Sequence, residues 1–297
     1  MEKARSRRGR QIRNFAAQFS ARLPLLSVFL CRNYLGRILA GELEKNRNGG
    51  PAFSVDSTLA LRALGARSRF RLNPLAIGAC LPPYCRVGRE TARLYDYFLA
   101  SGDLKSRRED IRNNVIYREM AELCEYGADF RLMPLYADFV GHLAEGRPLT
   151  RYRVPLDSKL KIDEYFMMYL DLADSIKRRG LRSREEFVKS EKALDRWLAP
   201  KGLRSNKTEW FERDIGLAVL EDGSLAFNGC GQHRRALAMV LGLGSMPVEV
   251  QMIHKDWLAG VWKKSGRPTA LEALEEALEK LRARVEAGLY FCSSEEA

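Results

Sequence analysis

The spacing of hydrophobic and polar positions predicts helices through the first half of the chain. Apolar residues recur three and four positions apart within residues 91–102, 108–127 and 133–148, and a glycine or proline closes each segment. A basic start followed by a short apolar run at 23–31 predicts a basic amphipathic helix and then a buried helix at the N-terminus. We therefore expect residues 1–150 to form a basic, mostly helical N-terminal region.

Strand signals first appear after residue 150. Residues 151–160 alternate and contain β-branched side chains, a pattern that predicts a strand followed by a turn. Residues 163–183 then predict a helix that Gly180 closes, with basic residues in its last turn. Ser183 and Glu186 have the spacing of a capping box, which predicts the start of a further helix that ends before residue 200.

A hairpin, a helix and a strand are expected next. Asp222-Gly223 lies between two apolar runs and is a strong hairpin signal. A helix is predicted at 232–243 and a strand at 246–254, and we expect His254 to lie in a surface turn. The order strand, helices, hairpin, helix, strand is typical of an α+β domain, which we place at residues 151–260.

Residues 266–288 predict a C-terminal amphipathic helix. Thr269 is the expected N-cap and Glu272 its capping-box partner, and leucines follow at alternating spacings of three and four. Most amphipathic helices cover the core of their own chain, so we expect this helix to pack back on the protein. A homodimer through the C-terminal helix is the alternative.

The net charge of the chain indicates which partners to expect. The 297-residue chain has a formal net charge of +12, which favours anionic partners: nucleic acid, nucleotides or an acidic membrane surface. The apolar run at 23–31 is too short to span a bilayer, and no cleavage site follows it. These features predict a soluble, cytoplasmic protein without a transmembrane segment.

Cysteine and histidine do not predict a metal centre. The six cysteines have no repeating spacing, and Cys80 and Cys85 form a close pair without a second pair to complete a zinc site. Three histidines cannot supply a metal site alone. We predict reduced thiols and no bound metal.

The candidate chemistry is concentrated in the segment AFNGCGQHRRALAMVLGL at residues 226–243. A predicted strand ends there, the chain bends through Gly229 and Gly231, and an apolar-periodic helix begins. A helix N-terminus presents unpaired N–H groups and the positive end of the helix dipole, which suits a phosphate. His233 and Arg234 stand in the first turn, where His233 is either a phosphate ligand or a structural histidine. Arg235 is expected to face solvent or to reach an anionic partner from the rim. A purely structural turn is the second interpretation of this segment.

Other chemistries for this turn are weaker. Cys230 is a candidate reactive thiol because cations and a helix N-terminus lower a thiol pKa, but a small buried side chain is the favoured interpretation. Cys230 and His233 as a metal pair would need two further ligands, and no cluster supplies them.

Several segments together resemble the ParB/sulfiredoxin-like fold. The segments that carry the resemblance are, in chain order, VPLD at 154–157, LADSIKRRGL at 172–181, Asp222-Gly223, and GQHRRALA at 231–238. The last is most similar to uncharacterised ParB-like bacterial proteins. In this fold the turn holds nucleotide phosphates, so the resemblance implies that role for Gly231, Gln232, His233 and Arg234.

The segment also departs from its relatives. Gln232, His233 and Ala236 replace residues of the motif in ParB proteins that hydrolyse CTP, so CTP switching is not implied. Gln232 also stands where sulfiredoxin has its cysteine, which disfavours sulfiredoxin chemistry. The short chain after residue 260 leaves no place for the helix-turn-helix region of ParB, so site-specific DNA binding is not implied either.

The sequence thus predicts an α+β protein that binds a nucleotide or another phosphate-bearing ligand, with or without Mg²⁺, at residues 231–235. Phosphoryl transfer or nucleotide hydrolysis is the most natural reaction class if the protein is an enzyme, but no general base is identifiable, so no catalytic residue is assigned. One alternative is a basic nucleic-acid-associated module without catalysis, using the N-terminal arm and surface arginines. Another is an interaction scaffold that dimerises through the C-terminal helix.

Overall fold

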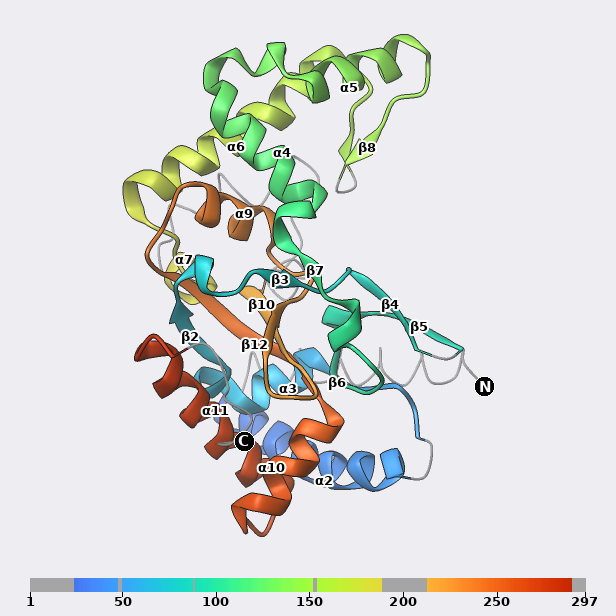
Figure 1. Cartoon of the computed structure of the whole chain (residues 1–297), viewed down its shortest axis with the longest axis vertical. Helices are drawn as coiled ribbons and strands as arrows, with labels where there is room; N and C mark the ends of the chain where they lie inside the picture. Colours follow the sequence, from blue (N-terminus) through green and yellow to red (C-terminus); the bar gives the residue numbers. More distant parts are fainter. Residues whose placement is uncertain (1–23, 48–49, 88, 152–153, 189–212, 290–297) are drawn as a thin grey trace.

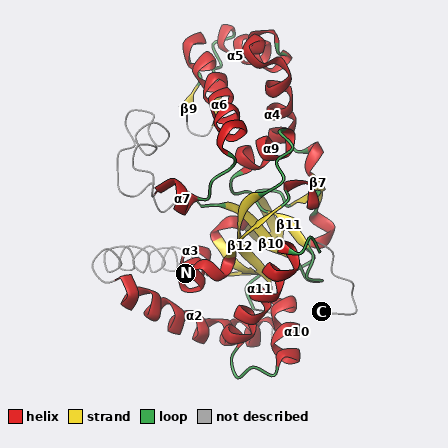
Figure 2. Ribbon diagram, turned by 90° about the vertical axis from the view of Figure 1, so that its left-hand side faces the viewer, coloured by secondary structure: helices red, strands yellow, loops and turns green. Residues whose placement is uncertain are grey.

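Strands from distant parts of the chain meet in one mixed sheet (Figures 1 and 2). The computed structural model describes residues 24–47, 50–87, 89–151, 154–188 and 213–289. Eight described strands form this sheet: β1 (Phe53–Asp56), β2 (Arg69–Leu72), β3 (Ala79–Cys80), β6 (Tyr97–Ala100), β7 (Glu109–Asp110), β10 (Ile215–Val219), β11 (Leu225–Phe227) and β12 (Met246–His254). Their order is β1-β6-β12-β10-β11-β3-β7, and β2 pairs with β12. The chain is therefore a mixed α+β protein, as predicted.

Two small hairpins and a set of α-helices accompany this sheet, together with short 3-10 turns. The hairpins are β4 (Tyr84–Val87) with β5 (Glu90–Arg93), and β8 (Thr150–Arg151) with β9 (Val154–Pro155). The helices are α2 (Pro24–Arg47), α3 (Ser57–Leu64), α4 (Val115–Tyr126), α5 (Pro134–Ala144), α6 (Lys159–Arg179), α7 (Arg184–Val188), α9 (Gln232–Val240), α10 (Lys255–Ser265) and α11 (Ala270–Glu286). Among the described residues, no helix combines the length and the apolar character needed to cross a membrane.

Strands before residue 150 were not predicted. β1 to β7 all lie there, and five of them join the sheet that holds β10, β11 and β12. The helix predicted for residues 91–102 is wrong, because β5 and β6 occupy this segment. Leu94 and Phe98 have helical spacing, yet both are fully buried, and Phe98 lies in β6 between β1 and β12. A strand that is covered on both faces does not show the alternation of apolar and polar residues by which strands are identified in a sequence.

Other boundaries agree with the sequence analysis. α4 ends at Tyr126, where Gly127 with φ 55° follows, and β12 covers the predicted strand. The predicted capping box is present before α7: the Glu186 N–H donates to Ser183 Oγ at 3.2 Å, and the Ser183 N–H donates to Glu186 Oε2 at 2.6 Å. The rest of that predicted helix and the basic helix expected before α2 lie outside the described residues.

The sheet is buried on both faces near its centre. Leu217 and Val219 of β10 pack into a cluster with residues of α2, α3, α9 and α11. Ala218 and Leu220 point the other way, into a cluster with Cys85 and Ala92 of the β4–β5 hairpin. Alternating side chains of one strand thus fill two cores, which makes β10 wholly buried and fixes its position.

The C-terminal helix packs back on the protein. Leu271, Leu274 and Leu278 of α11 are buried, and α11 contacts α2, α10 and β2. Its N-cap is Thr269, whose hydroxyl accepts from the Glu272 N–H at 3.2 Å, as predicted. Arg32 of α2 also donates to both carboxylate oxygens of Glu275, with the Nη2–Oε2 bond at 2.7 Å.

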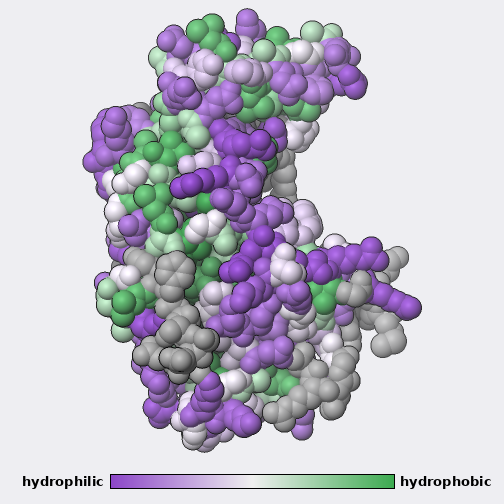
Figure 3. All heavy atoms as spheres, viewed as in Figure 1, coloured by the Kyte–Doolittle hydropathy of each residue, from purple (hydrophilic) through white to green (hydrophobic). Residues whose placement is uncertain are grey.

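A group of helices stands at the opposite end of the molecule. Figure 1 shows α4, α5 and α6 above the sheet, with α9 between them and the strands. Aromatic rings pack between α5, α6 and the 3-10 turn at Gly127–Leu132. Phe130 of this turn, Tyr136 of α5 and Phe166 of α6 have ring centroids 5.7–5.8 Å apart. Figure 3 shows a hollow, mostly hydrophilic face between these helices and the β4–β5 hairpin. α9, which begins at the glycine turn, therefore lies between the helices α4 and α6 and the strands of the sheet.

Candidate functional site at the glycine turn

The turn between β11 and α9 depends on glycine. Gly231 is the N-cap of α9 with φ 71° and ψ 25°, in the left-handed region, and no side chain caps the first-turn amides. A Cβ at this position would lie 3.0 Å from Cγ1 of Ile215. Both the backbone conformation and the close approach of β10 therefore require glycine at the start of this helix.

Gly216 of β10 holds the turn from the side. Its carbonyl accepts from the Asn228 N–H at 3.0 Å, and its own N–H donates to the Cys230 carbonyl at 3.3 Å. A Cβ on Gly216 would overlap the side chains of Asn228 and Gln251. The absence of a side chain here leaves room for a buried polar network beside the turn.

Gln251 is the centre of that network. The register between β10 and β12 shifts after Leu217, which pairs with Val250 while Ala218 pairs with Met252, so Gln251 lies at a β-bulge. Gln251 Nε2 donates to the Asp214 carbonyl at 3.0 Å and to Glu249 Oε2 at 3.2 Å. Its Oε1 accepts from Asn228 Nδ2 at 3.3 Å. Gln251 at the bulge of β12 thus connects this strand to the start of β10 and to the end of β11, beside the glycine turn.

Two buried carboxylates lie in the same network. Asp214 and Glu249 are each 3% exposed. Glu249 accepts a charge-assisted hydrogen bond from Arg69 Nε at 2.9 Å, and Asp214 accepts from the Arg184 N–H at 2.7 Å. Burial raises the pKa of Asp214, although the Arg184 amide and the charges of Arg234 and Arg69 act against the rise.

Arg234 is tied to the network. Its Nη2 donates to the Arg213 carbonyl, and its Nη1 lies 4.0 Å from Asp214 Oδ1. The Arg234 side chain is 26% exposed to solvent. The guanidinium therefore stands at the glycine turn with part of its surface open to solvent.

His233 packs as an aromatic residue. Its ring stacks on Tyr169 of α6, with centroids 4.4 Å apart and planes 13° apart. Burial, together with the charges of Arg151 and Arg235, lowers the pKa of His233 to about 3. The imidazole is therefore neutral near pH 7, so it does not bring the positive charge that a phosphate ligand would use.

Arg235 contradicts the expectation of a solvent-facing side chain. It is 1% exposed, and its guanidinium carbon lies 5.1 Å from the centroid of the Phe227 ring. Burial lowers the pKa of Arg235 to about 10, partly opposed by the charge of Cys80. The prediction failed because α4 packs against α9, so both sides of this helix are covered.

Cys230 does not have the surroundings of a reactive thiol. Burial raises its pKa, and the charges of Arg234 and Arg213 only partly offset the rise. The thiol therefore stays protonated near neutral pH, in line with the small-side-chain interpretation. No cluster of three or more metal-ligating side chains occurs in the described part of the chain.

His254 is another residue whose predicted place is wrong. It is 1% exposed instead of lying in a surface turn. Its Nδ1 accepts from the Asp256 N–H at 3.2 Å and caps α10, while its Nε2 donates to the Gly102 carbonyl at 2.8 Å. His254 thus joins the end of β12 to the loop after β6 and takes no part in the glycine turn.

Most of the network was not visible in the sequence. Asp214, Glu249, Gln251 and Arg69 meet only because β2, β10 and β12 are neighbours in the sheet. The one available signal was the pair Glu249 and Gln251, two polar residues inside an otherwise apolar strand segment.

Comparison of the chain with family models, curated proteins and solved structures finds no significant match.

Proposed function

We propose that this protein binds a nucleotide or another phosphate-bearing ligand at the N-terminus of α9. The observation that carries the proposal is the cap itself: Gly231 opens the helix without a side-chain acceptor for the first-turn amides. Amides of this kind and the positive end of the helix dipole attract phosphate oxygens. Arg234 adds a partly exposed guanidinium at the same turn.

Only some of residues 231–235 would contact the ligand directly. Gly231, Gln232 and Arg234 provide the amides and the polar side chains. His233 serves as a neutral wall stacked on Tyr169, and Arg235 acts only through its charge from the core. Phosphoryl transfer or nucleotide hydrolysis, with or without Mg²⁺, is the reaction class that such a ligand suits.

We also propose that residues 151–260 form a ParB/sulfiredoxin-like domain. The support is the order of elements: a short strand with Val154 and Pro155, then α6, the β10–β11 hairpin around Asp222-Gly223, α9 and β12. This order parallels the order of the motifs in the sequence.

A thermal-shift panel of nucleoside mono-, di- and triphosphates, with and without Mg²⁺, tests the binding proposal. A ligand that stabilises the wild type and not Arg234→Ala supports binding at the turn. Lys263→Ala is the control, because it removes one exposed cation from α10 and should bind like the wild type. A panel without any stabilising ligand would refute the proposal.

A nucleic-acid-associated module is the second candidate, favoured by the net charge of +12. Binding of this kind would weaken steeply between low and moderate salt and would persist in Arg234→Ala. Fluorescence anisotropy with a labelled oligonucleotide at two salt concentrations separates the two candidates.

A further inference from the structure

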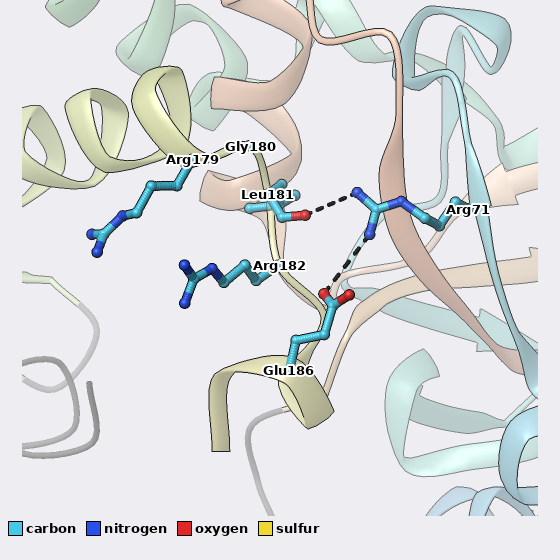
Figure 4. A pocket seen from close by; sticks show the side chains of 6 residues that line it. All are labelled: Arg71, Arg179, Gly180, Leu181, Arg182 and Glu186. Atoms are coloured by element: carbon cyan, nitrogen blue, oxygen red, sulfur yellow. Dashed lines mark hydrogen bonds and ion pairs between the residues drawn. The ribbon is translucent and has the colours of Figure 1, made fainter. Parts of the chain in front are cut away.

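An arginine-lined pocket lies where the end of α6 meets β2 and α7 (Figure 4). It has a volume of about 510 Å³, which is in the range of small-molecule sites. It contains none of the glycine-turn residues; its lining residues are Arg71, Arg179, Gly180, Leu181, Arg182 and Glu186.

The cations come from two walls of the pocket. In Figure 4 Arg71 reaches from β2 to one side of the backbone at Leu181, while Arg179 and Arg182 extend on the other side of that backbone. Arg71 is fixed in place, since Nη2 donates to the Leu181 carbonyl at 3.0 Å and Nε donates to Ser245 Oγ at 3.1 Å. The pocket therefore has one preorganised guanidinium and two on the opposite wall.

The two arginines of the second wall remain available to a ligand. Arg179 donates one hydrogen bond, from Nη2 to Ser175 Oγ at 2.6 Å, and keeps its other donors. Arg182 is exposed, and its charge helps to lower the pKa of Glu186, but it makes no hydrogen bond or close ion pair with the described residues. Several N–H donors thus face the pocket without a protein acceptor in this part of the structure.

The charge of the pocket is unbalanced. Among the described residues, three arginines and one carboxylate, Glu186, line the pocket. Glu186 lies 3.8 Å from Arg71 and also caps α7 by accepting from the Ser183 N–H. Compensation of the α6 dipole explains a cation in the last turn of that helix, such as Arg179. It does not explain Arg71 on β2, or Arg182, which lies beyond the helix end.

We propose that this pocket binds a compact polyanion with more than one phosphate group, such as a pyrophosphate or the diphosphate part of a larger molecule. One guanidinium group can donate two parallel hydrogen bonds to two oxygens of a phosphate. Cations on two walls of the pocket therefore suit a ligand with a phosphate at each end. The site is separate from the glycine turn, and it does not depend on the proposed function.

Isothermal titration calorimetry of the full chain with pyrophosphate, at constant ionic strength, tests this site. Arg182→Ala should weaken binding about ten-fold or more, because it removes a charge-assisted contact without breaking a described one. Glu186→Gln should strengthen binding several-fold, since it removes the one carboxylate among the described residues that line the pocket and glutamine keeps the capping box.

Two controls make the test specific. Arg178→Ala removes a neighbouring cation in the last turn of α6 that pairs with Asp174 and does not line the pocket, so it should leave the affinity unchanged. Arg234→Ala should also bind pyrophosphate normally, which separates this site from the glycine turn. Equal losses in Arg178→Ala and Arg182→Ala, or no binding by the wild type, would overturn the proposal.

Discussion

The imidazole of His233 stacks on the phenol ring of Tyr169, with centroids 4.4 Å and planes 13° apart. This contact joins the first turn of α9 to α6, the longest helix of the group above the sheet. It also keeps His233 in an environment that opposes protonation, since burial lowers its pKa to about 3.

The stack predicts an acid-sensitive fold. In the unfolded chain the His233 pKa is near 6.5, so the unfolded state binds a proton that the folded state does not. The stability from neutral His233 is complete above about pH 6.5 and is lost as the pH falls toward 3, by at most about 1.4 kcal/mol per pH unit. Urea unfolding between pH 4.5 and 7.5 measures this slope.

His233→Phe should keep the stack and make the pH dependence less steep. His142→Gln is measured alongside as the matched histidine substitution, because His142 lies on α5 with a partly exposed side chain. An unchanged slope in His233→Phe would contradict the buried neutral imidazole.

Arg235 is expected to contribute to packing more than to ligand binding. Arg235→Met keeps the length of the side chain beside Phe227, so the free energy of unfolding should stay within about 1 kcal/mol of the wild type or rise. Arg235→Ala should lose about 2–4 kcal/mol because it leaves a cavity. Denaturant unfolding measures both variants, and a large loss in Arg235→Met would mean that the charge itself stabilises the fold.

Gly216→Ala should disrupt the polar network beside the turn. Its Cβ would overlap Asn228 and Gln251, so we expect a loss of about 1–3 kcal/mol in the free energy of unfolding. Gly260→Ala in α10 is the matched control, since a Cβ there meets no atom within 4 Å and should raise stability slightly. If both variants were equally stable, the close approach at Gly216 would be refuted.

The packing of α11 gives a prediction about assembly. Leu274 is fully buried against the body of the same chain, so Leu274→Ala should cost about 2–4 kcal/mol and leave the mass in solution unchanged. Leu289→Ala is the control, because Leu289 is 61% exposed. Light scattering measures the mass, and a drop from dimer to monomer in Leu274→Ala would instead favour the homodimer.

Local signals in the sequence predicted the local structure well. The hairpin at Asp222-Gly223, the capping pair of Ser183 and Glu186, and the helix start at Thr269 each depend on neighbours a few residues apart. Such contacts leave a spacing that can be recognised in the chain.

Contacts between distant residues could not be predicted. The helix expected at 91–102 was wrong because a strand buried on both faces has no alternation, and its partners lie far away in the sequence. The same limit applies at the site. Arg234 and Arg235 are adjacent and chemically identical, yet packing by α4 decides that one is partly exposed and the other is buried.

The position of β12 in the sheet has a consequence for biosynthesis. β12 is the last described strand, yet β2, β6 and β10 all pair with it, and Met246 meets Leu72 while Ile253 meets Leu99. During translation β2 and β6 leave the ribosome long before their central partner is made. Because such long-range pairing slows folding and leaves strand edges open, the nascent chain must stay free of aggregation until residue 254 emerges.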